Sequence, residues 1–175
     1  MEENNNSYSP ILELLTVAKE YCFFIEKISS FDNEKTFDFL RKILPLLYVK
    51  GSAIKTIDNV DDSFMQRYVT EEMYENIFND IRNKIGNKNV FYTFDEDLKE
   101  SVEMNMSECL SDIYQDLKDV SIAYFNGIEN EKQSAQYCLK EWFASRWGMC
   151  IAKLMPYLHY LFEKETNNQN GIEFD

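Results

Sequence analysis

The chain has 175 residues, of which 45% are hydrophobic, 15% aromatic and 28% charged, and its formal net charge is −13. A domain of this size buries enough apolar surface to fold without disulfides or a structural metal. So acidic a surface repels phosphate backbones and anionic lipid, which argues against nucleic-acid and membrane partners. With five glycines and three prolines the chain has few breaks, which favours long helices over many short strands.

Four cysteines are spread through the chain, and none forms a Cys-x-x-Cys pair: Cys22, Cys109, Cys138 and Cys150. The first ten residues, MEENNNSYSP, have neither the basic nor the apolar region of a signal peptide. No stretch approaches 18 uninterrupted apolar residues. We therefore expect reduced cysteines in a cytoplasmic protein, and the sequence indicates no cofactor.

The first half of the chain predicts three helices after a disordered N-terminal tail, residues 1–8. Ser9-Pro10 is typical of a helix start, and the apolar spacing continues to about residue 28. A cap at residue 32 or 33 begins a second helix, which contains Pro45 and ends near residue 51. Residues 56–69 form an acidic connection, after which Thr70 caps a third helix that ends at Gly86.

Near residues 88–95 the apolar period shifts from helical spacing toward two. Val90, Tyr92 and Phe94 alternate with Phe91 and Thr93, as in a short strand. An isolated strand is not stable, and we identify no second strand to pair with it. We therefore expect an extended aromatic segment whose rings pack on the helices.

The second half predicts three more helices. The central helix covers residues 105–127. Asn105 and Glu108 form a capping box at its start, and Asn126-Gly127 ends it in a left-handed turn. A capping box at Asn130 starts a fifth helix, which runs to about residue 147, and the last helix runs to about residue 164. The fold class is therefore all-α. We expect a single-domain bundle of about six helices over residues 9–165 and a flexible C-terminal tail over 166–175.

Two segments in this order, LPLLY (residues 44–48) and DIYQDLKD (residues 112–119), resemble an uncharacterised all-helical bacterial family, a domain of unknown function. YCFFIE before them and WFASRWG after them add weaker similarity. The resemblance implies an α-helical cytoplasmic domain over about residues 10–163. It implies no activity, ligand or catalytic residue.

The central helix carries an acidic stripe beside its apolar face. Within this stripe Asp112, Asp116 and Asp119 are the candidate metal ligands, because carboxylates on one helix bind a divalent cation when another helix supplies more. A divalent-metal-dependent hydrolase is therefore the alternative function. A solvated helix flank is the simpler interpretation, and we assign no metal site and no catalytic residue from the sequence.

Arg146 falls on the apolar face of the fifth helix, where a guanidinium needs a carboxylate or an aromatic ring. Asp116 lies at the edge of the buried stripe of the central helix. We therefore predict a structural ion pair between Arg146 and Asp116, with Asp112 and Glu20 as the other candidate carboxylates.

Three apolar residues fall outside the inner faces of their helices and are candidates for a partner surface: Leu12, Phe23 and Trp147. For Leu12 and Phe23, burial under a second element is the simpler interpretation. With no catalytic set visible, the sequence favours a non-enzymatic helical protein-interaction module of the cytoplasm. Its expected partner is another protein or a second copy of the chain.

Overall fold

The computed structural model describes residues 9–169, so the predicted tail at 1–8 and residues 170–175 of the second predicted tail lie outside the described residues. The last helix continues to Gln169, beyond the predicted end near residue 164 and into the region predicted as a flexible tail. The predicted all-α fold is confirmed. The helices are α1 Pro10–Glu26, α2 Asn33–Ser52, α3 Glu71–Ile85, α4 Met106–Asn126, α5 Glu129–Ser145 and α6 Trp147–Gln169.

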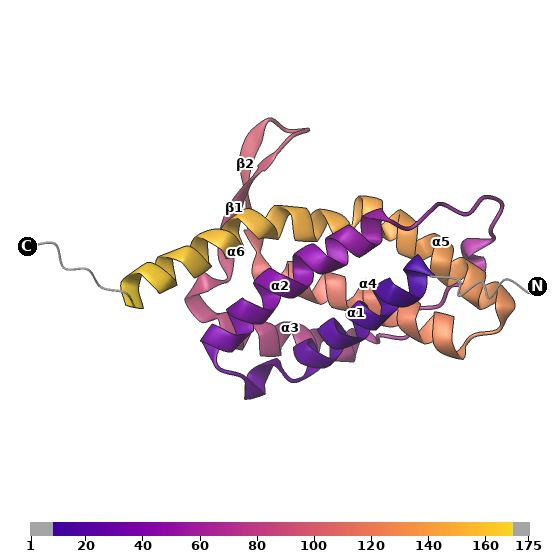
Figure 1. Ribbon diagram of the computed structural model, residues 1–175, viewed down its shortest axis with the longest axis horizontal. Helices are drawn as coiled ribbons and strands as arrows, with labels where there is room; N and C mark the ends of the chain where they lie inside the picture. Colours follow the sequence, from indigo (N-terminus) through magenta and orange to yellow (C-terminus); the bar gives the residue numbers. More distant parts are fainter. Residues whose placement is uncertain (1–8, 170–175) are drawn as a thin grey trace, which may run out of the picture.

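Helix α4 lies at the centre of the bundle and contacts α1, α3, α5 and α6 (Figure 1). Helix α2 packs on α1 and α6. The burial of α4 follows from its sequence, because its apolar stripe is flanked by small residues. Ser107, Ser111 and Ala123 are all fully buried beside the leucines and isoleucine of the core. Small side chains let neighbouring helices approach closely, so α4 can be covered on several sides at once.

Local capping sets the helix starts, in part as the sequence predicts. The side chains of Asp32 and Thr70 accept from the third backbone N–H of α2 and α3. The predicted capping box at Asn105 is wrong. Instead, the cap comes from Asn89, which precedes Ser107 by 18 residues. Its Oδ1 accepts a hydrogen bond from the Ser107 N–H at 2.8 Å. The predicted left-handed end of α4 is also wrong, because Gly127 has φ −78 and ψ 161.

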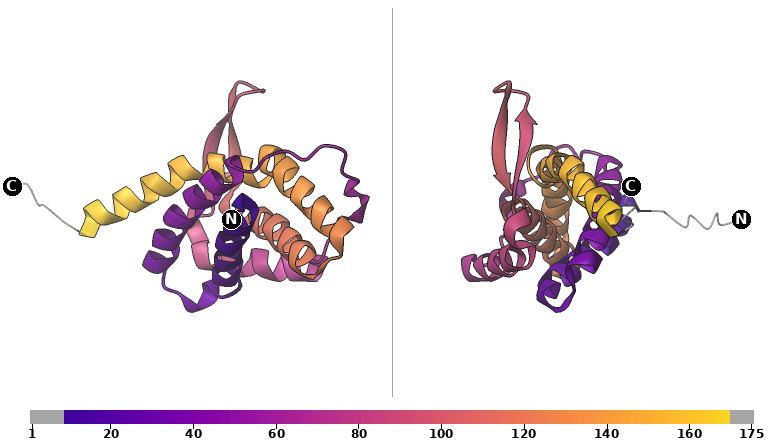
Figure 2. Two further views of the ribbon diagram at one scale, coloured as in Figure 1. Left: turned by 45° about the vertical axis from the view of Figure 1, so that its right-hand side comes forward. Right: turned by 90° about the vertical axis from the view of Figure 1, so that its left-hand side faces the viewer.

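The extended aromatic segment is one strand of a β-hairpin, which corrects the prediction that it has no partner. Strand β1, Val90–Asp95, pairs antiparallel with β2, Glu100–Asn105, so that Val90 lies opposite Asn105 and Asp95 opposite Glu100. The hairpin projects from the side of the bundle (Figures 1 and 2). Its aromatic rings therefore do not all pack on helices.

No helix within residues 9–169 combines the length and apolar character needed to cross a bilayer.

Candidate functional site

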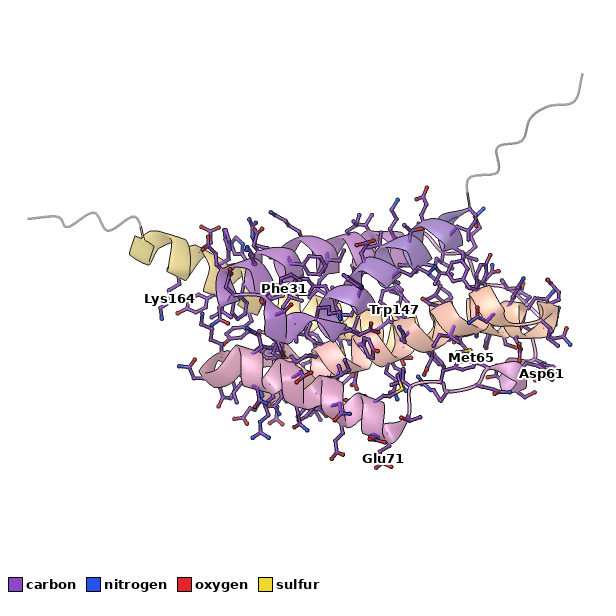
Figure 3. The ribbon with its side chains drawn as sticks, turned by 90° about the horizontal axis from the view of Figure 1, so that it is seen from below. Phe31, Asp61, Met65, Glu71, Trp147 and Lys164 are labelled. Carbon is purple, nitrogen blue, oxygen red and sulfur yellow. The ribbon has the colours of Figure 1, made fainter. Side chains whose placement is uncertain are left out.

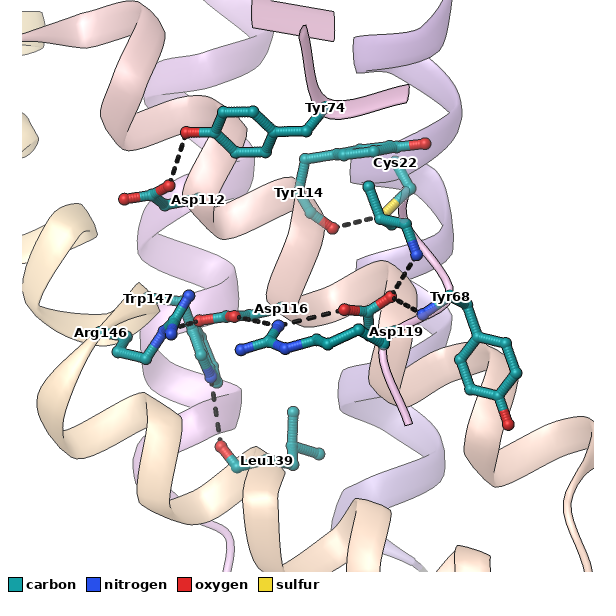
Figure 4. Close-up of polar contacts among 12 residues, drawn as sticks. Cys22, Tyr68, Tyr74, Asp112, Tyr114, Asp116, Asp119, Leu139, Arg146 and Trp147 are labelled. Carbon is teal, nitrogen blue, oxygen red and sulfur yellow. Dashed lines mark hydrogen bonds and ion pairs between the residues drawn. The ribbon is translucent and has the colours of Figure 1, made fainter. Parts of the chain in front are cut away.

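Two residues of the acidic stripe are buried rather than solvated, because arginines from two other segments reach them. Asp116 and Asp119 are both 0% exposed. Asp116 accepts from Arg146 Nε at 2.9 Å through Oδ2 and from Arg67 Nη1 at 2.9 Å through Oδ1 (Figure 4). The structure thus joins Arg146 to Asp116, and it adds a second arginine that sequence reasoning missed.

Asp119 holds the connection between α2 and α3 against the bundle. Its Oδ1 accepts from the backbone N–H groups of Tyr68 at 2.8 Å and Val69 at 2.7 Å, and its Oδ2 accepts from Arg67 at 3.1 Å. Figure 3 follows this connection from Asp61 through Met65 to Glu71, where α3 begins. Arg67 is the single basic residue among the acidic residues 56–69, and this isolated positive charge was the signal that could have identified it.

The same two arginines also contact one aromatic ring. The guanidinium carbon of Arg67 lies 4.0 Å from the ring centroid of Trp142, and that of Arg146 lies 5.7 Å from it. We call Arg67, Asp116, Asp119 and Arg146 the charge cluster; it holds two cations and two anions. Burial raises the pKa of Asp116, while the two guanidinium groups oppose the rise. Every carboxylate oxygen of the cluster has a partner, so the cluster serves as a clamp.

Asp112 is also engaged, since it accepts from the Tyr74 hydroxyl of α3 at 2.7 Å. Burial, and then this bond, raise the pKa of Tyr74. Among the described residues, no three His, Cys, Asp or Glu side chains converge as metal ligands would. The three candidate metal ligands thus bind arginine, tyrosine and backbone groups, and the geometry gives the hydrolase alternative no support.

Of the three predicted surface residues, two are exposed and one is not. Leu12 and Phe23 are exposed, so no second described element covers them. Trp147 is 0% exposed, which corrects its assignment to a partner surface. The prediction placed Trp147 at the end of the fifth helix, on its outer side. In the structure α5 ends at Ser145 and Trp147 is the first residue of α6, so its direction is not set by the periodicity of α5. The indole Nε1 donates to Leu139 O at 3.2 Å.

The hairpin, residues 90–105, has one packed face and one open face, and we call it the hairpin arm. On the packed face, the Phe91 ring stacks on Tyr157 of α6 with centroids 5.3 Å apart. Farther along, Lys153 Nζ of α6 lies 3.8 Å from Asp95 Oδ2. On the open face, Tyr92 is 67% exposed and Phe94 is 53% exposed, and Val90 beside them is exposed too.

The hairpin arm as a whole is acidic, and Glu103 lies opposite Tyr92 on the open face. The arm contains five carboxylates and one lysine: Asp95, Glu96, Asp97, Glu100, Glu103 and Lys99. The hydroxyl of Tyr92 donates to Glu103 on the opposite strand at 2.8 Å, which raises the pKa of Tyr92. In the four-residue turn, Asp95 accepts from the N–H groups of Asp97 and Leu98, both at 3.0 Å. An exposed apolar strip on an acidic arm is therefore the most distinctive surface of the hairpin.

Comparison with known proteins places this fold in a family without assigning it an activity. A search of curated proteins gives no match. Among solved structures, the crystal structure of protein BF1032 from Bacteroides fragilis matches with a TM-score of 0.77 and 31% sequence identity. The match covers 87% of this chain and 92% of that one. The family described as "Domain of unknown function (DUF5063)" matches residues 7–164, and the chain belongs to that family.

Proposed function

We propose that the protein is a non-enzymatic protein-interaction module of the cytoplasm and that the hairpin arm is its binding element. The observation that carries the proposal is the open face of Val90, Tyr92 and Phe94, because the opposite face of the same strand is packed on α6. Apolar side chains that gather on one exposed face, and not singly, are typical of an interaction surface. Aromatic side chains are also enriched in the central parts of interfaces.

The charges of the arm select the kind of partner. The arm carries five carboxylates and one lysine, and Glu103 lies on its open face. An acidic arm with an exposed apolar strip fits an extended segment of another protein in which lysine or arginine alternates with apolar residues. Such a segment can add to the sheet through main-chain hydrogen bonds, because the described sheet has only two strands. A second copy fits less well, since each chain carries a formal charge of −13.

The cysteines support the cytoplasmic part of the proposal. Cys22, Cys109 and Cys138 are buried, Cys150 is partly buried, and all four are free thiols. Free cysteines are ordinary in a reducing compartment, and proteins of oxidising compartments more often pair them.

The test is to select peptides from a phage-displayed library of random linear peptides on the immobilised protein. The enriched peptides are then titrated against three proteins in solution. These are the wild type, the double variant Tyr92→Ser with Phe94→Ser, and the control Phe64→Ser, which changes an exposed aromatic residue in the 3-10 turn Asp62–Phe64. The double variant removes both rings of the open face, and the control removes one exposed ring elsewhere.

We expect basic, aromatic-rich peptides whose affinity falls about tenfold or more in the double variant and is unchanged in the control. Their affinity should also fall with added salt, because the charges at this surface are screened. Enrichment of acidic peptides, or equal affinity for the double variant, would contradict the proposal. Sedimentation that shows a dimer lost in the double variant would assign the arm to a second copy instead.

A further inference from the structure

A groove lies where α1 rests against α4, and its lining residues all come from these two helices. It is an open groove of about 320 Å³, at the lower end of the range of about 300–1,000 Å³ that is common for small-molecule sites. Its apolar lining comes from Phe23 of α1 and from Ile122 and Phe125 of α4. Phe23 is 60% exposed, so its ring forms an accessible wall of this groove.

Among the described residues, the ionised groups of the groove leave one cation without a counter-ion. Glu26 accepts from the Tyr114 hydroxyl at 2.9 Å and from Lys118 Nζ at 2.7 Å, so its charge is matched. Lys19 Nζ lies 4.0 Å from the centroid of the Phe125 ring and makes no ion pair with any carboxylate of the described residues. The groove therefore has a net positive charge in a protein whose overall charge is strongly negative.

The buried thiol at this groove adds no negative charge. Cys22 lines it, and its Sγ lies 4.0 Å from the Tyr114 carbonyl oxygen, to which it donates. Burial raises the pKa of the Cys22 thiol to about 12, so the group is neutral at physiological pH. A bound anion would thus meet a cation and apolar rings without a repelling thiolate.

We infer that the groove between α1 and α4 binds a small free carboxylate with an aliphatic tail. The carboxylate would pair with Lys19, and the tail would lie along Phe23, Ile122 and Phe125. A charge next to an apolar wall is the pattern that selects a ligand with one ionised end and one apolar end. This inference concerns a different surface from the hairpin arm, so either proposal can fail alone.

The experiment is a calorimetric titration of the full-length protein with sodium decanoate below its micelle-forming concentration. Decanol, which has the same tail and no charge, is the matched ligand control. The variant Lys19→Met keeps a chain of similar length and removes the charge, and Phe125→Ala removes one wall. The protein control is Lys35→Met on α2, whose side chain is 73% exposed and does not line the groove.

We expect saturable decanoate binding that weakens about tenfold in Lys19→Met and is unchanged in Lys35→Met. Decanol should bind more weakly than decanoate to the wild type and equally to wild type and Lys19→Met. Phe125→Ala should weaken both ligands, and each methylene removed from the tail should lower the affinity about fourfold. No saturable decanoate binding, or equal affinities for wild type and Lys19→Met, would overturn the inference. Lys19 is an exposed residue, so its substitution should leave the melting temperature unchanged and any lost binding would not reflect unfolding.

Discussion

Arg67 and Asp116 are 49 residues apart in the chain, and a 2.9 Å hydrogen bond between Nη1 and Oδ1 joins them. The same Nη1 lies 3.1 Å from Asp119 Oδ2, so one guanidinium nitrogen links two carboxylates on successive turns of α4. Through this contact the irregular connection before α3 is fixed to the central helix. The charge cluster therefore fixes the course of the connection between α2 and α3, and its charged groups bind one another and not a ligand.

Replacing Asp119 with alanine should lower the free energy of unfolding by about 3 kcal/mol, because a buried group that leaves its partners unsatisfied is costly to remove. The N–H groups of Tyr68 and Val69 would lose their acceptor, and Arg67 would lose one of its two carboxylates. Urea denaturation followed by circular dichroism measures the change. Asp58→Ala, at an exposed position of the same connection, should change stability by less than about 0.5 kcal/mol. Equal losses in the two variants would contradict a specific role for Asp119.

The pH dependence of stability should reveal the protonation of Asp116. Burial raises its pKa above the ordinary value of 3.8, so the folded state binds its proton more tightly than the unfolded state does. The contribution of Asp116 to stability is therefore largest below 3.8 and is lost as pH rises through the raised pKa. The difference in unfolding free energy between wild type and Asp116→Asn should grow as pH falls from 7 toward 3.8. If this free-energy difference became smaller as the pH falls, the pKa of Asp116 would be lowered in the folded state and not raised.

The two faces of strand β1 should differ sharply in their contribution to stability. Phe91 is buried and stacks on Tyr157, whereas Phe94 is exposed on the open face. Phe91→Ala should cost about 3 kcal/mol, because it leaves a cavity against α6. Phe94→Ala should cost less than about 0.5 kcal/mol. Thermal and urea denaturation of the two variants side by side would decide this, and similar costs would mean that the open face is packed in solution.

Gly51 should not accept a methyl group, although alanine is the better helix former. A Cβ at this position would overlap the Trp147 ring and would lie 2.6 Å from Phe143 Cδ2. Gly51→Ala should therefore destabilise the protein by about 1–3 kcal/mol through overpacking. The neighbouring exposed change Ser52→Ala should have little effect. Denaturation midpoints measure both, together with the tryptophan emission maximum, which should shift only in Gly51→Ala.

The start of α4 offers a comparison between two asparagines. Asn89→Ala removes the acceptor of the Ser107 N–H and should cost about 1 kcal/mol, the usual value of a helix cap. The side chain of Asn105 caps no N–H group of α4, so Asn105→Ala should cost less. If urea denaturation showed that Asn105→Ala lowers the free energy of unfolding more than Asn89→Ala does, Asn105 would be the cap of α4, as the sequence predicts.

The helices could be predicted from spacing along each segment, and the contact between Arg146 and Asp116 from the need of a guanidinium near apolar residues for a carboxylate. Apolar periodicity shows which side of a helix is buried; Asp116 lies at the edge of the buried side of α4, and Arg146 directly follows the last residue of α5. Arg67 could not be predicted in the same way. It lies in an irregular connection whose path across α4 is set by tertiary contacts, which local periodicity does not encode.

Trp147 and strand β2 show two further limits. The helix breaks at Arg146, with φ −130 and ψ −92, and not after residue 147 as the sequence predicts. Successive side chains of a helix point about 100° apart around its axis. Because the helix ends before Trp147, this rotation does not predict the direction of the Trp147 side chain. Strand β2 is mostly polar, and its turn lacks the Asn-Gly or Asp-Gly signal of a tight hairpin. The alternation of Val102 and Met104 with polar residues was the remaining signal.

The register of the hairpin arm places its first and last residues directly opposite each other, Val90 against Asn105. An insert whose two ends meet can be lengthened, shortened or replaced by a short loop while the flanking chain keeps its course. The bundle is then a constant frame and the arm an exchangeable part. Grafting a different hairpin between these two positions would offer a route to a new binding specificity on the same scaffold.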